Sequence, residues 1–296
     1  MTSDSPIRTP PAPAPTRIGR RVFEWGSRTF VMGIVNVTPD SFSGDGILAS
    51  VAGSHGAAAE AAAVQARRMV DEGADILDVG GESTRPGHEP VAADEETARV
   101  VPAIAAIHAA LPDVPISVDT TKPEVAAAAL DAGAALLNDV WGVRRDGAMA
   151  RLAGERHVPL IVMHNRAEAT YADVVAEVLA DLAAAVELAQ GLGVARENLI
   201  VDPGFGFGKT PEHNIEVMRH LRELRGLGLP VLLGTSRKST LGRVLGGVPP
   251  EERLEATLAT TALAIAAGVD IVRVHDVLAN VRAARMTDGI VRGSPW

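Results

Sequence analysis

Short runs of apolar residues recur along the whole chain, and polar residues and a Gly- or Pro-containing turn follow each of them. In the clearest case Asp202 comes directly after the apolar run 199–201, and Pro203 and three glycines then break the strand. Seven further runs have the same form and cover residues 31–37, 75–79, 115–119, 135–139, 160–164, 230–234 and 270–276. The intervening residues have mostly helical patterns, for example 57–71 and 171–190. The pattern predicts eight strands that alternate with helices.

The predicted strands are continuous apolar runs, which is typical of parallel sheets covered by helices. Their ends recur about every 34 residues between Asn36 and Arg273, which matches the size of a βαβ unit. We therefore predict an α/β fold with a single (β/α)8 TIM barrel over residues 18–296. A doubly wound sheet shows the same alternation, but eight similar units without an edge-like strand favour the barrel. Residues 21–30 are expected to form a short hairpin around Gly26-Ser27 under the barrel.

Composition narrows the class of protein. The chain has 296 residues, of which 47% are hydrophobic, and this is enough for one large core. A net charge of −9 argues against nucleic acid as a partner, and the lack of cysteine excludes disulfides, thiol nucleophiles and Cys-ligated zinc. Residues 1–17 are rich in Pro, Ser and Thr, so we expect a disordered tail rather than a signal peptide. No stretch has transmembrane length without charges, which favours a cytoplasmic enzyme with no membrane partner.

The predicted fold gathers polar side chains on one face. In a (β/α)8 barrel the C-terminal ends of all strands meet at the same end, here called the mouth, and active sites lie there. Each side chain at these positions has an ordinary structural explanation when it is taken alone. Together they are hard to explain by stability, because buried polar groups cost free energy. The residues are Asn36, Asp119, Asn138, Met163, His164, Asp202, Lys238, Arg273 and His275.

These residues divide by chemistry into two groups. Asp119, Asn138 and Asp202 offer hydrogen-bond acceptors, which suit a flat heterocycle rich in N–H groups. A second group can bind an anion, and it consists of Asn36, Arg85, Arg237, Lys238, Arg273 and His275. The mouth is thus expected to bind a polar heterocycle that carries a phosphate or diphosphate, and the long loops around Phe42 and Thr84-Arg85-Pro86 are expected to close over it.

Eight segments in order carry a resemblance to a known family. They include Asp78-Val-Gly-Gly-Glu-Ser-Thr-Arg-Pro-Gly87 and Asp202-Pro-Gly-Phe-Gly-Phe-Gly-Lys209. The other six are residues 33–43, 117–120, 138–139, 163–164, 234–239 and 273–276. On these motifs the sequence resembles the dihydropteroate synthases from about Val31 to Asp276. That family joins 6-hydroxymethyl-7,8-dihydropterin diphosphate to 4-aminobenzoate, which gives 7,8-dihydropteroate and diphosphate.

The resemblance implies a role for each matching residue. Asp119, Asn138, Asp202 and Lys238 would hold the pterin, with Met163 against its face. Asn36 would ligate a Mg²⁺ ion that bridges the diphosphate, and the diphosphate itself would contact Arg85, Arg273 and His275. The aminobenzoate pocket, which is also the sulfonamide pocket, would be lined by Phe42, Thr84, Pro86, Phe207 and Ser239.

Catalysis in this family is dissociative, and the residues expected to promote it are Lys238, Arg273, Asp202 and Asp119. Diphosphate leaves first, and the amine then attacks a cationic methylene. A metal ion and cations would stabilise the leaving group, while the two carboxylates would favour the cation.

One loop departs from the family pattern, and two alternatives stay open. Residues 41–46 read Ser-Phe-Ser-Gly-Asp-Gly where the family usually has Ser-Phe-Ser-Asp-Gly-Gly, so the acid is displaced to Asp45. A pterin-binding paralogue with little synthase activity is one alternative. A pterin-dependent methyltransferase is the other, but it would not need the cations Arg85, Arg273 and His275.

The predicted helix over residues 252–267 indicates a homodimer. Its apolar stripe is Leu254, Leu258, Ala262 and Ile265, and alanines occupy much of the rest of its surface. A helix that is small and apolar nearly all round needs burial on more than one side, and a second subunit could cover the outer one.

Overall fold

The structure is a computed structural model that describes residues 12–38, 47, 55–82, 90–141, 143 and 146–293. Four residues of the expected substrate site, Phe42, Thr84, Arg85 and Pro86, lie outside the described residues, as does Asp45.

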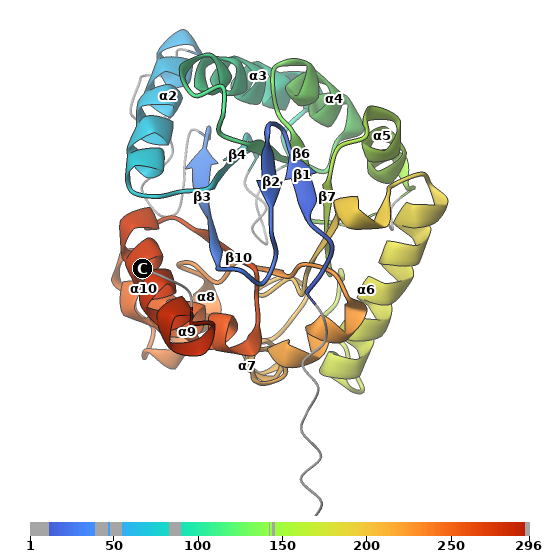
Figure 1. Ribbon diagram of the computed structural model, residues 1–296, viewed down its shortest axis with the longest axis vertical. Coiled ribbons are helices and arrows are strands. Elements are labelled where there is room, and N and C mark those ends of the chain that lie inside the picture. Colours follow the sequence, from blue (N-terminus) through green and yellow to red (C-terminus); the bar gives the residue numbers. More distant parts are fainter. Residues whose placement is uncertain are drawn as a thin grey trace, which may run out of the picture.

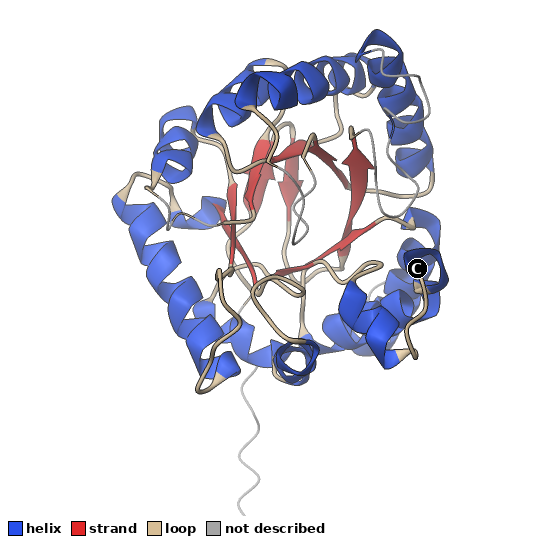
Figure 2. Ribbon diagram, turned by 180° about the vertical axis from the view of Figure 1, so that it is seen from behind, coloured by secondary structure: helices blue, strands red, loops and turns tan. Residues whose placement is uncertain are grey.

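Eight parallel strands form a closed barrel (Figures 1 and 2). They are β3 (Phe30–Asn36), β4 (Ile76–Gly80), β5 (Ile116–Asp119), β6 (Leu136–Asp139), β7 (Leu160–Met163), β8 (Leu199–Asp202), β9 (Leu232–Leu233) and β10 (Ile271–Val274). Their order in the sheet is β8-β7-β6-β5-β4-β3-β10-β9. A parallel bridge between Val201 and Val231 joins the two ends, so the predicted barrel is confirmed and the open, doubly wound sheet is wrong.

Helices surround the barrel as an outer ring (Figure 2). They are α2 (His55–Asp71), α3 (Ala93–Ala110), α4 (Pro123–Asp131), α5 (Ala148–Arg156), α6 (Val174–Gly191), α7 (Pro211–Arg219), α8 (Ser239–Val244), α9 (Leu254–Ala267) and α10 (Val277–Val291). Three short 3₁₀ segments cover Arg196–Asn198, Leu221–Leu227 and Pro250–Glu252. Local sequence fixes several helix starts: Asp173 caps α6, and Thr210 and His213 form a capping box on α7.

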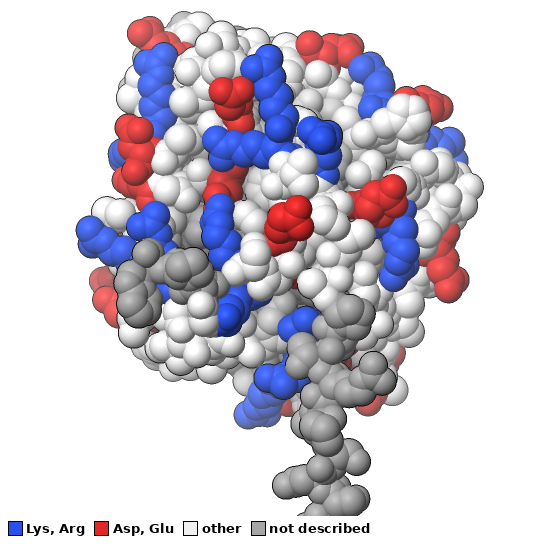
Figure 3. Space-filling model, in the orientation of Figure 1, with Lys and Arg blue, Asp and Glu red and all other residues white. Residues whose placement is uncertain are grey.

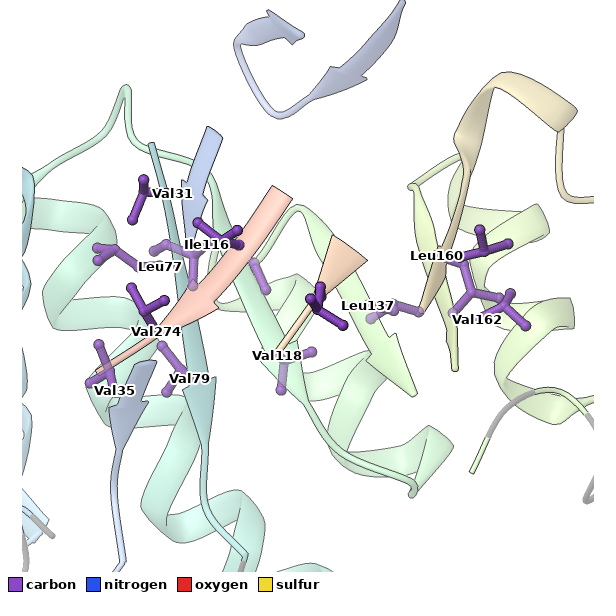
Figure 4. Close-up of a cluster of buried hydrophobic side chains, with 14 of the residues drawn as sticks. Val31, Val35, Leu77, Val79, Ile116, Val118, Leu137, Leu160, Val162 and Val274 are labelled. Carbon is purple, nitrogen blue, oxygen red and sulfur yellow. The ribbon is translucent and has the colours of Figure 1, made fainter. Parts of the chain in front are cut away.

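The main core lies between the strands and this ring of helices. Aliphatic side chains such as Val79, Val118 and Leu160 pack there with almost no exposure (Figure 4). Alanines on the inner faces of the helices, such as Ala62, bring helix and strand close together. Within the described residues, no helix combines the length and apolar character needed to cross a membrane.

The inside of the barrel changes from apolar to polar along the strands. A second buried cluster includes Met32, Ile76, Leu136, Ile161, Ile200, Leu232 and Ile271, one from each of seven strands. Side chains alternate along a strand, so the residue two positions later points the same way. On β4, β6, β8 and β10 those later residues are Asp78, Asn138, Asp202 and Arg273. The mouth is therefore polar although every strand reads as an apolar run.

A small hairpin covers the opposite end of the barrel (Figure 1). Its strands are β1 (Thr16–Ile18) and β2 (Arg21–Phe23), which pair antiparallel. The turn lies at Gly19-Arg20, so the hairpin expected around Gly26-Ser27 was placed too late in the chain. The aromatic rings that follow β2 fill the barrel floor instead, because Trp25 and Phe30 pack edge to face with ring centroids 5.4 Å apart.

The hairpin also shortens the segment that we expected to be disordered. β1 begins at Thr16, whose side chain accepts a hydrogen bond from Trp25 Nε1 at 2.9 Å and donates one to the Glu197 carbonyl at 2.6 Å. On the face shown in Figure 3, acidic and basic side chains are interspersed.

Helix α9 buries a different face from the one predicted. Its buried residues are Thr257, Thr261, Ala264 and Ile265, so only Ile265 of the expected stripe is fully buried. The buried threonines are tolerated because each hydroxyl has a partner, for example Thr261 Oγ1 with Asn280 Oδ1 at 2.8 Å.

Candidate active site

Neighbouring strand ends bring the predicted acceptor residues together. Asp119 at the end of β5 lies opposite Asn138 on β6, and Met163 at the end of β7 lies opposite Asp202 at the end of β8. All four residues are buried, with exposed fractions between 3% and 7%. Parallel pairing in register thus brings four residues that are far apart in the sequence into one patch.

Arg273 on β10 lies at the centre of the polar network in the mouth. Its Nε donates to Asp78 Oδ2 at 2.5 Å, and its Nη2 donates to Asp119 Oδ2 at 2.6 Å. The two carboxylates raise the pKa of Arg273 further despite its burial. The guanidinium therefore stays charged and holds the two acids on one side.

Asp78 has a larger part in the site than its sequence position indicated. It is fully buried on β4 and accepts hydrogen bonds from both Arg273 and Asn138 Nδ2, the latter at 3.1 Å. Because the Asn138 amide nitrogen donates to Asp78, the amide oxygen Oδ1 of Asn138 is left as an acceptor for a ligand. Asp78 thus orients two residues of the site although its own side chain is not exposed.

Burial raises the pKa of both acids at the strand ends. For Asp119 the desolvation outweighs the attraction of Arg273 and raises its pKa to about 7, with Asp78, Glu96 and Asp139 adding to the rise. Its Oδ1 is buried and has no hydrogen-bond partner among the described residues. Burial also raises the pKa of Asp202, although the positive charge of Lys238 opposes this rise. A ligand with N–H donors would satisfy these oxygens and favour their charged form.

The glycine-rich turn after β8 provides the other side of the pocket. The Nζ of Lys238 donates to the Phe205 carbonyl and lies 4.4 Å from the centre of the Phe207 ring. Burial lowers the pKa of Lys238 to about 8, although Asp202 and Asp119 oppose that shift. At Gly204, with φ +69°, an added Cβ would lie 1.8 Å from the His164 carbonyl, so only glycine fits.

The predicted anion-binding residues separate in the structure. The Nδ1 of His275 lies 2.9 Å from Ser236 Oγ, which fixes its ring beside β10. Arg237 forms a bidentate ion pair with Asp276, at 2.7 and 3.0 Å, and its expected contact with an anion stays a prediction.

Three other predicted residues differ in exposure and in position. Ser239 is exposed at the start of α8, next to Lys238, and Asn36 is half-buried at the end of β3. His164 does not line the mouth, because its side chain is 1% exposed and its Nδ1 contacts Lys209 Nζ at 2.8 Å. It is a core histidine, and burial lowers its pKa to about 3.

The described part of the site offers a metal ion few protein ligands. The described residues contain no group of three or more His, Cys, Asp or Glu that could hold one. Mg²⁺ typically keeps several waters and takes few protein ligands together with substrate phosphates, so the Asn36 amide oxygen at the end of β3 is compatible with that ion.

The fold and the site together define a (β/α)8 barrel enzyme with a mouth suited to a flat, polar heterocycle and an adjoining anion. A family model described as pterin binding enzyme matches residues 32–275. A dihydropteroate synthase of Clostridium beijerinckii is 49% identical over 277 residues, which are 93% of this chain and 99% of that protein. The chain belongs to the dihydropteroate synthase family of pterin-binding enzymes.

Solved structures agree with this assignment. A Clostridium difficile dihydropteroate synthase determined in the presence of pteroic acid has a TM-score of 0.84 and 50% identity, and the match covers 91% of this chain and 99% of that one. The Xanthomonas albilineans enzyme with 4-aminobenzoic acid has a TM-score of 0.86 and 42% identity, with 94% and 98% covered.

Proposed function

We propose that the chain condenses 6-hydroxymethyl-7,8-dihydropterin diphosphate with 4-aminobenzoate to form 7,8-dihydropteroate and diphosphate. The observation that carries this proposal is the pairing of buried acceptors with cations at one barrel mouth. Asp119, Asn138 and Asp202 face the mouth from β5, β6 and β8, and Lys238 and Arg273 lie beside them. Family membership supports the same reaction.

The acceptor residues suit the pterin ring. Asp202 and Asp119 are buried carboxylates that gain from N–H donors, and the Asn138 amide is oriented with its oxygen free. Met163 adds a polarisable apolar surface at the end of β7 against which a flat ring can pack. The hydrogen-bond pattern supplies selectivity, because an analogue that lacks a donor would leave a buried acceptor unpaired.

The cations suit departure of the diphosphate. The C–O bond between the pterin methylene and the diphosphate breaks with its electron pair going to the oxygen, and the amine nitrogen of 4-aminobenzoate then forms the new C–N bond and loses a proton. Arg273 and His275 would bind the leaving group, while the negative charge of Asp202 and Asp119 favours the cationic methylene. Arg85 is assigned the same role but lies outside the described residues.

We propose Mg²⁺ as the metal ion, with Asn36 as its protein ligand. When bound, the ion would neutralise negative charge on the diphosphate. Phe207 and Ser239 are proposed to line the aminobenzoate pocket with Phe42, Thr84 and Pro86, and sulfonamides are expected to compete with 4-aminobenzoate there. The cytoplasmic location stays a prediction from the sequence.

A homodimer is proposed through α9 and α10, which pack side by side (Figure 1). Their outer surfaces carry large apolar side chains that are mostly exposed: Leu263 at 64%, Met286 at 66% and Ile290 at 70%. Apolar residues gathered on two adjacent helices are typical of a surface that a partner covers. Light scattering at micromolar concentration should give twice the chain mass, and a monomeric mass would reject the dimer.

Two assays separate this function from the alternatives. Release of diphosphate in the presence of both substrates is expected for the synthase, whereas a paralogue without turnover would bind pterin diphosphate in calorimetry but release nothing. A pterin-dependent methyltransferase is disfavoured by the Arg273 and His275 group, and it would bind the pterin with no gain from the diphosphate.

A further inference from the structure

Lysine has an unusual distribution in this chain. The sequence contains 28 lysine and arginine residues, and three of them are lysines: Lys122, Lys209 and Lys238. Lys209 closes the glycine-rich turn that follows β8. Its Nζ lies 2.8 Å from His164 Nδ1 and donates to the carbonyls of Gly204 and Phe207, both at 3.1 Å. An ammonium has three N–H donors, so three neutral acceptors use all of them.

The histidine partner is fixed in one protonation state. Burial and the Lys209 charge lower the pKa of His164 to about 3, so the ring is neutral. Because Nδ1 accepts from Lys209, the ring proton is on Nε2, which faces Asp181 Oδ2 at 3.2 Å. Arg166 in turn binds Asp181 at 2.8 Å and anchors this chain of contacts to α6.

The remaining polar groups of the turn are also held by side chains. Asn214 accepts from the Gly206 N–H at 2.7 Å, and the Tyr171 hydroxyl donates to the Gly208 carbonyl at 2.7 Å. Side-chain bulk is excluded as well, because a Cβ on Gly206 would lie 2.8 Å from Lys238 Cδ. The turn therefore has little freedom to shift while these contacts persist.

The same turn supports Lys238 on its other side. Lys238 Nζ donates to the Phe205 carbonyl and lies over the Phe207 ring. Lys209 binds the carbonyls of Gly204 and Phe207, and Lys238 contacts the Phe205 carbonyl and the Phe207 ring, so both lysines hold the same turn. A change in the position of the turn would therefore move the Lys238 ammonium.

We propose that Lys209 is a positioning residue: it fixes the turn Gly204–Gly208 against His164, so that the Phe205 carbonyl and the Phe207 ring hold Lys238 in place at the substrate pocket. Lys209 acts through Lys238 and does not touch the substrate. The inference rests on the proposed function, because Lys238 is there assigned to the pterin.

The test uses the full-length protein and Lys209→Met, which keeps the length of the side chain and removes its donors. Calorimetry with a pterin that lacks the diphosphate is expected to show a dissociation constant about tenfold higher, since small displacements of a positioned group cost one to two orders of magnitude. A second readout is ¹³Cε-lysine NMR, where three lysines give three signals. The pKa of Lys238 should rise from about 8 toward its ordinary 10.5 as water enters a looser site.

The matched control is Arg219→Met on α7, which removes an exposed cation paired with Glu216 at 2.9 Å. It should change neither readout. The proposal is overturned if Lys209→Met folds, binds the pterin as the wild type does and leaves the Lys238 titration unchanged.

The wild-type protein gives an independent test if the variant does not fold. Burial lowers the pKa of Lys209 to about 7, so its ¹³Cε signal should titrate far below 10.5 and its amine should acylate slowly. Fast acylation of Lys209 would show that its amine is exposed and does not bridge the turn, and this result would overturn the proposal. Failure of the wild type to release diphosphate would reject the proposed reaction alone, since both NMR measurements are made without turnover.

Discussion

Replacing Asp202 by asparagine tests the pterin pocket most directly. The side chain ends β8, and its Oδ1 already accepts the Gly204 N–H at 2.7 Å. Asparagine has the same shape and can keep that bond, so the turn should stay in place. Asp202→Asn removes the negative charge, and it replaces the second carboxylate oxygen by an NH₂ group, which is a donor.

The size of the effect follows from the bond that is lost. A hydrogen bond to a charged group contributes about 1.5–3 kcal/mol to stability or binding. Loss of one such bond raises the dissociation constant of the pterin about 10- to 150-fold. The upper part of this range is expected, because the site is buried and the new amide N–H would face a ligand N–H.

Calorimetry with a pterin that lacks the diphosphate measures this loss without contributions from the anion site. Lys238 provides a second readout, because Asp202 raises its pKa and the variant should lower that pKa below about 8. The control is Asp113→Asn, an exposed acid paired with Arg20 at 3.1 Å, which should bind pterin normally. A dissociation constant for Asp202→Asn within twofold of the wild type would refute the assignment of Asp202 to the pterin.

Three further predictions follow from the same geometry. Asp78→Ala should lower the free energy of unfolding by about 3–5 kcal/mol in urea denaturation, because it removes one partner of the buried Arg273 ion pair; an effect below 1 kcal/mol would contradict this. Asp119 titrates near 3.8 when unfolded and about 7 when folded, so the folded state holds more protons and stability should fall as pH rises from about 4 to about 7; Asp119→Asn should remove that slope, and an unchanged slope would reject the shift. Diphosphate with Mg²⁺ should strengthen 4-aminobenzoate binding by about 1–3 kcal/mol, and Arg85→Ala should reduce this coupling in calorimetry; equal affinity with and without diphosphate would show that the pocket is already formed.

The sequence by itself determined the fold and the position of the site. Apolar runs of strand length at regular intervals require helices on their outer side, and a ring of eight such units puts all strand ends at one mouth. Asp119, Asn138, Met163 and Asp202 could be selected from this rule alone, because each lies at or next to the end of its run. The local pattern is sufficient for this prediction, because each run and the polar residue at its end are adjacent in the sequence.

The tertiary structure decided which of these polar residues face the pocket and which pair with one another. Asp78 and Arg273 are 195 positions apart, yet their bond orients the centre of the site. Arg237 pairs with Asp276, and the buried His164 contacts Lys209. Such pairings depend on strand register and on the depth of each side chain in the barrel. Those quantities arise from packing between segments far apart in the chain, so no local pattern encodes them.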